Sequence, residues 1–267
     1  MDPISQRHVE DIRSFKAKKL HNLRIEYAVK ALESRESFLE VGCGEGFCTR
    51  SIAHWSKKPF RRIEGFDLDA IRIARAQSLW SDDGRIRYRV SDAGKPFPYR
   101  DGEFDAVVLL DILEHVPAPE YILRESLRVL KKGGIFFLVV PCEGEPGTLH
   151  SLLHRRRWKG SEKYGGHIQQ FRKKDIADQL EGMGLERRWA RYSCHWIGQL
   201  TDVAGYEIKR LADLKAGQSL TRGEGIKFYL LKKAMKTFLQ KLSYGESAVL
   251  ARVGAGAMDL NICFQKT

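Results

Sequence analysis

The sequence is poor in cysteine and lacks long apolar runs. Its five cysteines are odd in number, scattered along 267 residues, and form no C-x-x-C pair, which argues against a disulfide framework and against a zinc site. No segment approaches the roughly 20 apolar residues of a membrane-spanning helix. Residues 1–16 also lack the apolar core of an export signal. We therefore expect a cytoplasmic protein with reduced cysteines.

Acidic residues are fewer than basic ones. The chain has 34 Asp and Glu against 46 Lys and Arg, which gives a formal net charge of +12. Such an excess favours anionic partners, which include nucleic acids, phosphorylated molecules and membrane surfaces. Charge alone does not choose between these partners.

The order of apolar segments predicts the fold class. Residues 5–34 are charged, contain no Gly or Pro, and carry a loose apolar stripe, so we expect one or two amphipathic helices there. From residue 37 onward, short apolar strands alternate with helical segments, which predicts a parallel sheet with helices on both faces. The expected strands are 37–41, 62–67, 85–90, 104–110, 135–140, 186–196 and 257–265, and the expected helices are 47–56, 69–79, 120–130, 173–183, 199–215 and 223–242.

The segments between these elements divide the chain. Two lysines and the Gly133–Gly134 pair follow the helix expected at 120–130, a pattern typical of helix ends. Residues 142–172 are expected to form a long functional loop with little regular structure. We predict three parts, which are an N-terminal helical segment at 1–35, a ligand-binding α/β domain at 36–198 and 250–267, and a helical cap inserted at 199–249.

The first expected strand runs into a glycine-rich loop, F-L-E-V-G-C-G-E-G-F. Its glycines allow a sharp turn and a close approach to a ligand, which the first amides of the next helix also face. Asp67 follows Gly44 by 67 − 44 = 23 residues, near the roughly 20-residue spacing of an acid that binds ribose hydroxyls. Phe47 stands where a dinucleotide fingerprint needs a third glycine, which argues against a nicotinamide-dependent dehydrogenase. Glu40 precedes the glycines, where an acid suits a cationic ligand.

Further motifs follow this loop in a fixed order: G-F-D, V-S-D-A, F-D-A-V-V-L-L-D-I-L-E-H-V and L-K-K-G-G. Together with E-x-G-x-G-x-G, they resemble the ordered motifs of class I S-adenosylmethionine-dependent methyltransferases over residues 37 to 141. The resemblance implies a Rossmann-like, doubly wound α/β fold with a seven-stranded sheet whose last strand is antiparallel. It also implies S-adenosyl-L-methionine as cofactor, with S-adenosyl-L-homocysteine as product.

The same resemblance assigns roles to individual residues. It implies that the glycine loop contacts the methionine part, that Asp67 binds the ribose, and that Asp92 with Ala93 meets the adenine. Leu110, at the end of the fourth strand, is expected to line the methionine and sulfonium region. The residues expected at the cofactor are Arg24, Glu40, Gly42, Cys43, Gly44, Asp67, Leu68, Asp92, Ala93 and Leu110.

Structural alternatives stay open for several of these residues. Asp67 is also placed to cap the helix that starts near Asp69. Asp92 also suits an ordinary turn. For Glu40, the alternative is a salt bridge to a lysine or arginine of the N-terminal segment. The loop cysteines are more typical of packing than of nucleophiles.

Transfer to a hydroxyl acceptor requires a base that takes its proton, and the sequence shows no carboxylate cluster with metal-ligand spacing. His115 in L-E-H-V and His167 in Y-G-G-H-I-Q-Q-F are the candidate catalytic residues, with structural anchoring as the alternative for each. These two segments and the upstream K-L-H-N-L-R are similar to the ubiquinone-biosynthesis O-methyltransferases and their relatives. That resemblance places His167 close to the substrate pocket and implies that Arg24 reaches the cofactor carboxylate.

The chain differs from that group of methyltransferases in the helical insert expected at 199–249. Inserts similar to it cover the acceptor in methyltransferases of sugars, lipids and secondary metabolites. We therefore predict methyl transfer to a hydroxyl of a small molecule, lipid or glycan unit. An RNA or protein methyltransferase and a non-catalytic cofactor-binding homologue remain alternatives, and the oligomeric state stays open.

Basic residues gather at 154–159, 172–174 and 226–242. The last of these segments has three interpretations: a solvated helix packed over the core, a helix resting on an anionic membrane, or a contact with nucleic-acid phosphates. The sequence has no N-P-P-Y-type base-methylating motif and no recognisable RNA-binding module, so nucleic acid is less favoured than the other two. Peripheral association with a membrane is thus a secondary expectation.

Overall fold

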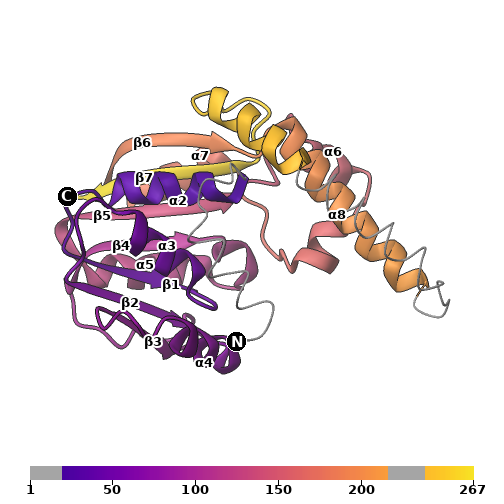
Figure 1. The fold of residues 1–267 in the computed structure, drawn as a ribbon. Helices are drawn as coiled ribbons and strands as arrows, with labels where there is room; N and C mark the ends of the chain where they lie inside the picture. Colours follow the sequence, from indigo (N-terminus) through magenta and orange to yellow (C-terminus); the bar gives the residue numbers. More distant parts are fainter. Residues whose placement is uncertain (1–19, 216–237) are drawn as a thin grey trace.

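The computed structural model describes residues 20–215 and 238–267, through which a seven-stranded sheet runs in the order β3-β2-β1-β4-β5-β7-β6 (Figure 1). The strands are β1 Ser37–Val41, β2 Arg62–Asp67, β3 Ile86–Val90, β4 Phe104–Leu110, β5 Leu130–Pro141, β6 Leu185–Ser193 and β7 Asp259–Lys266. The first five strands pair in parallel, whereas β7 is antiparallel to both β5 and β6. The predicted doubly wound sheet with an antiparallel last strand is confirmed.

Helices cover both faces of the sheet (Figure 1). One face packs against α2 (Leu20–Ala31), α3 (Phe47–Trp55) and α4 (Ala70–Leu79), and the other against α5 (Pro119–Val129) and α7 (Lys173–Gly182). The central strand β4 alternates between the two cores, since Val107 and Leu109 face one while Ala106 and Val108 face the other. Its side chains are therefore apolar almost without interruption, as expected for a strand that is buried on both faces.

A group of helices projects from the carboxyl edge of the sheet (Figure 1). We call this group the helical arm. It consists of α6 (Leu149–Arg155), the long α8 (Trp196–Lys215) and a helix at 238–249. Its parts are tied together, because Gln199 accepts a hydrogen bond from the Leu149 amide at 2.6 Å and Glu207 accepts one from the Trp158 indole at 3.0 Å. No helix within the described ranges is long and apolar enough to cross a bilayer.

Several predicted boundaries are wrong. The 142–172 region is not without regular structure, since it contains α6 and a π-helical turn at Ser161–Gly165. β5 begins at Leu130, earlier than expected, because Leu130 already pairs with Phe104 and the following glycines lie within the strand. β6 ends at Ser193, and α8 starts at Trp196 rather than at 199. The helices expected before residue 20 and at 223–237 lie outside the described residues.

Candidate functional site

Two cavities lie at the carboxyl edge of the sheet, where open α/β folds bind their ligands. The larger has a volume of about 800 Å³ and borders the glycine loop, and the smaller has a volume of about 420 Å³ and borders the helical arm. Asp111, His115 and Gly165 line both cavities. The two spaces therefore meet at the end of β4, as expected for a site that joins two reactants.

The glycine loop supplies one wall of the larger cavity. Gly42 lies at φ +73°, and a Cβ atom added to it would stand 2.4 Å from the Ile112 side chain. Only glycine, which has no Cβ atom, tolerates both the left-handed backbone conformation and this close approach. The Gly42 amide donates to the Phe66 carbonyl at 2.9 Å, which fixes the loop against the end of β2.

Asp67 lies at the end of β2 and lines the larger cavity. Its Oδ2 accepts a hydrogen bond from the Gly44 amide and its Oδ1 one from the Asp69 amide, both at 2.9 Å. The capping role belongs instead to Asp69, whose Oδ1 accepts from the Ile71 and Arg72 amides. Each oxygen of Asp67 keeps further acceptor capacity, so this carboxylate fits the pair of ribose hydroxyls that the sequence predicts.

The residues expected at the adenine, Asp92 and Ala93, line this cavity. Leu68, another residue predicted at the cofactor, lines it as well. Asp92 Oδ1 accepts from the Gly94 amide at 2.8 Å, so it makes the turn that was its structural alternative while its side chain stays 37% exposed. Asp92 is therefore able to form this turn and to contact a ligand at the same time.

Three of the predicted cofactor residues lie behind the cavity wall. Glu40 is buried and accepts a hydrogen bond from the Thr49 hydroxyl of α3, and burial raises the pKa of Glu40 to about 8. The Cys43 side chain packs on Gly65, and burial raises the pKa of its thiol. Leu110 is buried in the core beneath α2 and α3. Its neighbour Asp111 is the residue that reaches both cavities.

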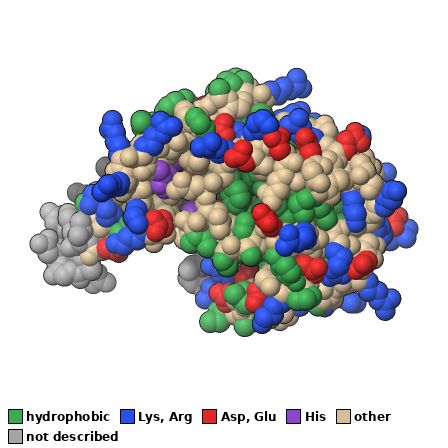
Figure 2. Space-filling model, turned by 180° about the vertical axis from the view of Figure 1, so that it is seen from behind, with side chains coloured by type: hydrophobic (Ala, Val, Ile, Leu, Met, Phe, Trp, Pro, Cys, Tyr) green, Lys and Arg blue, Asp and Glu red, His purple; other side chains and the backbone are tan. Residues whose placement is uncertain are grey.

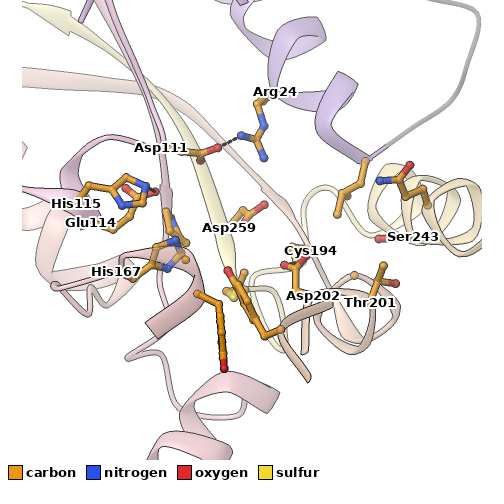
Figure 3. A pocket seen from close by; sticks show the side chains of 18 of the residues that line it. Arg24, Asp111, Glu114, His115, His167, Cys194, Thr201, Asp202, Ser243 and Asp259 are labelled. Atoms are coloured by element: carbon orange, nitrogen blue, oxygen red, sulfur yellow. Dashed lines mark hydrogen bonds and ion pairs between the residues drawn. The ribbon is translucent and has the colours of Figure 1, made fainter. Parts of the chain in front are cut away.

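Arg24 extends from α2 to the junction of the two cavities. It forms an ion pair with Asp111 and lines the smaller cavity (Figure 3). Asp111 itself lies at φ +51°, an uncommon conformation for a residue other than glycine, which is often found at functional sites. The place of Arg24 beside the end of β4 suits the predicted contact with the cofactor carboxylate.

His167 lines the smaller cavity and is held by a residue that the sequence did not reveal, Glu143. The His167 Nδ1 lies 2.8 Å from Glu143 Oε1, and the Ser161 hydroxyl and His154 Nε2 lie 2.7 and 3.0 Å from Oε2. Burial alone raises the pKa of Glu143, but the hydrogen bond and charge of His167 outweigh it and lower this pKa to about 2. An ionised carboxylate only accepts hydrogen bonds, so Nδ1 of His167 donates and Nε2 is left as the basic atom.

His115 lies beside His167, with ring centroids 5.0 Å apart. Its Nδ1 donates to the Gly166 carbonyl at 3.1 Å, and burial lowers the pKa of His115. The ligand atoms of Glu114, His115 and His167 all lie within 4.8 Å of one another, so this group is placed to hold a metal ion. The fold thus assembles a possible ligand set from two segments that show no ligand spacing in the sequence.

The basic residues at 154–159 lie at the end of α6 and in the turn that follows it. Arg155, Arg156 and Arg157 are exposed there, and Figure 2 shows Lys and Arg side chains over the arm, next to a hollow that contains histidine. Most of the segment at 226–242 lies outside the described residues. Contact with an anionic membrane or with RNA stays a prediction. Measurements of binding to anionic liposomes and to RNA at two salt concentrations test it.

Comparison with known proteins extends the motif evidence. A family model described as a methyltransferase domain matches residues 10–188. The ubiquinone biosynthesis O-methyltransferase of Xanthomonas axonopodis pv. citri (strain 306) is 36% identical over 122 residues, which cover 45% of this chain and 49% of that protein. The enzyme of the same name from Hydrogenovibrio crunogenus is 35% identical over 124 residues, with the same coverage. The chain spans about half the length of these curated relatives.

Solved structures share the fold at low identity. The geranyl diphosphate C-methyltransferase of Streptomyces coelicolor A3(2), solved with Mg²⁺, geranyl diphosphate and S-adenosyl-L-homocysteine, has a TM-score of 0.57 and 16% identity over 93% of this chain and 80% of that chain. The cyclase SpnF has a TM-score of 0.61 and 18% identity over 92% and 80%. Proteins with different named activities thus share this fold, so the chemistry must be argued from the site.

Proposed function

Because the chain belongs to the methyltransferase-domain family and is a class I S-adenosylmethionine-dependent methyltransferase, we propose that it methylates a hydroxyl of a small molecule, lipid or glycan unit. The observation that carries this proposal is that His167, in the wall of the smaller cavity, is hydrogen-bonded to the buried Glu143. A neutral hydroxyl is a weak nucleophile, and a positioned histidine is the usual group that removes its proton. A carboxylate behind the histidine fixes the tautomer that this role needs.

The cavities suit the two reactants. When bound, S-adenosylmethionine supplies a methyl group activated by a sulfonium. The loop cradle at Gly42 and the acceptor capacity of Asp67 support its place in the larger cavity. With the cofactor bound, the methyl group would pass from the sulfonium sulfur to the acceptor oxygen, with S-adenosylhomocysteine as the leaving group. His167 Nε2 would take the proton of the acceptor hydroxyl, and Glu143 would stabilise the resulting imidazolium.

The size of the smaller cavity favours a small acceptor. Its volume of about 420 Å³ lies within the range of small-molecule sites, and the helical arm forms one side of it. An RNA or protein acceptor would have to present a single group through this opening. The names of the curated relatives also support oxygen as the methylated atom.

Replacement of His167 tests the proposal. The His167→Ala variant should lose about 10²- to 10⁴-fold in turnover, measured as labelled methyl transferred to a panel of phenols, catechols and sugars. Its affinity for S-adenosylhomocysteine should change little, because His167 does not line the larger cavity. His54→Ala, which alters an exposed histidine of α3, is the matched control. Full turnover of His167→Ala would refute the role of His167 as the base.

A further inference from the structure

The smaller cavity carries three carboxylates that the proposed reaction does not use. They come from separate elements, since Glu114 lies in the 3₁₀ turn after β4, Asp202 in α8 and Asp259 at the start of β7. Figure 3 shows Asp259 between the histidine side of the pocket and Asp202. The fold thus brings acids from distant parts of the chain to one wall.

The positive groups around this cavity already have partners. Arg24 is paired with Asp111, and His167 is bound to Glu143. Lys209 donates to the Tyr164 carbonyl at 3.1 Å. A carbonyl is neutral, so the charge of Lys209 remains in the wall, but the three carboxylates outnumber it.

The hydrogen bonds of these acids are weak or missing. Within the described ranges, Asp202 Oδ2 accepts only from the Cys194 thiol, a weak donor, at 3.6 Å, and Asp259 Oδ2 accepts from the Ser193 hydroxyl at 3.4 Å. Glu114 is 1% exposed, and its Oε2 has no hydrogen-bond partner among the described residues. A buried acceptor that lacks a donor destabilises the protein. A ligand that donates a hydrogen bond to this acceptor removes that penalty.

Two hydroxyls in the same wall point to a polar ligand as well. Tyr164 Oη and Ser243 Oγ are buried, line this cavity, and lack a partner within the described part of the chain. Buried polar groups in proteins are satisfied with few exceptions. A cluster of exceptions around one cavity indicates groups that bind a ligand.

Burial makes the ionised form of each acid costly. For the two aspartates, it raises the pKa of Asp202 to about 6 and also raises the pKa of Asp259. A cation in the cavity reverses this cost because it favours the ionised carboxylates. An apolar acceptor leaves the cost in place.

We propose that the acceptor carries a protonated amine near the hydroxyl that is methylated, and that Asp202 and Asp259 bind this amine while the hydroxyl faces His167. This inference rests on the proposed function for the place of the hydroxyl. It defines the substrate class as amino alcohols, amino sugars and aromatic amines with ring hydroxyls. The three N–H donors of an ammonium match the carboxylate oxygens of this wall, whose own hydrogen bonds are weak or missing among the described residues.

Matched probes that differ only in the amine test the inference. Dopamine is compared with 4-ethylcatechol, and D-glucosamine with D-glucose, by calorimetry in the presence of S-adenosylhomocysteine. In at least one pair, the amine should bind about ten-fold or more tightly than its neutral partner. A gain of this size is what a close charge pair contributes to the affinity of a binding site. Asp202→Asn and Asp259→Asn should each reduce this preference several-fold. Asp213→Asn, on the exposed surface of the same helix as Asp202, should leave it unchanged.

The possible outcomes separate this inference from the proposed function. Equal or weaker binding of the amine in both pairs, or no binding of any probe, overturns the inference. Methyl transfer to the neutral probes would then leave the proposed function intact. Methyl transfer to the nitrogen of an amine probe, as product analysis by mass spectrometry shows, would overturn both the inference and hydroxyl methylation, because the nitrogen would then face the methyl donor instead of Asp202 and Asp259.

Discussion

Replacing Glu143 with Gln removes a charge from the centre of the site while it keeps the size of the side chain. Three groups bind this carboxylate: His167, His154 and Ser161. The pKa of Glu143 falls from its ordinary 4.5 to about 2 because the partners outweigh the effect of burial. A difference of about 2.5 units corresponds to about 3 kcal/mol of net stabilisation of the ionised form.

This stabilisation has a defined pH dependence. A carboxylate whose pKa is lower in the folded than in the unfolded state stabilises the fold above the unfolded pKa, and its contribution is lost as the pH falls from about 4.5 to about 2. Urea unfolding at pH 7 should therefore show the Glu143→Gln variant less stable by up to about 3 kcal/mol. The gap between variant and wild type should narrow below pH 4.5.

The same substitution should change the pH dependence of catalysis. Burial alone lowers the pKa of His167. The hydrogen bond and charge of Glu143 outweigh this effect and raise the pKa above its ordinary 6.5. A base acts when neutral, so wild-type activity should fall as the pH drops through a value above 6.5. In Glu143→Gln this acid limb should move to lower pH, and kcat at the plateau should fall by about ten- to a hundred-fold because the base is weaker and less well oriented.

Rates of methyl transfer measured from pH 5 to pH 9, together with the affinity for S-adenosylhomocysteine, check this reasoning. Glu162→Gln, which alters an exposed glutamate close to the same turn, is the control and should retain the wild-type profile. An acid limb that stays in place in Glu143→Gln would show that Glu143 does not set the basicity of His167. A loss of cofactor affinity as large as the loss of kcat would show a general disturbance of the site instead.

Three further predictions concern the cofactor side. Asp67→Ala should weaken S-adenosylmethionine binding by about ten-fold or more in calorimetry, because a charged acceptor for ribose hydroxyls is lost; unchanged affinity would refute the ribose role. Gly42→Ala should lower Tm more than Gly147→Ala, since both glycines have a positive φ but only the new Cβ at Gly42 meets Ile112. Arg24→Gln should weaken binding of S-adenosylmethionine more than that of adenosine, and equal losses would place Arg24 away from the cofactor carboxylate.

The cofactor half of the site was readable because its parts lie close in sequence. The loop after β1 and the acid after β2 come to the same edge because the two strands are parallel neighbours, with Val41 paired to Phe66. Glycine at a positive φ and an acid at a strand end are local signals that the motif order reinforces. The wrong boundaries also have local causes, since α6 has only seven residues, too few to show a helical period.

The acceptor half depends on contacts that no local pattern records. Glu143 follows the end of β5 by two positions, and only the π-helical turn at Ser161–Gly165 brings His167 to it. An acid just beyond the carboxyl end of a central strand was the available signal for Glu143. Asp202 and Asp259 line one cavity because α8 begins at the carboxyl edge of the sheet, where β7 also begins, and nothing in their sequence neighbours indicates that arrangement.

The wall of the smaller cavity also narrows the range of acceptors that the sequence left open. A lipid chain in this space would leave the unpartnered oxygens of Glu114, Tyr164 and Ser243 without donors. Each such group costs about 1–3 kcal/mol when it stays unsatisfied, which is comparable with what a buried apolar side chain gains from leaving water. Apolar burial therefore brings little net affinity here, whereas an acceptor with several hydrogen-bond donors gains from every one of these groups. The balance favours a polar acceptor over a lipid one.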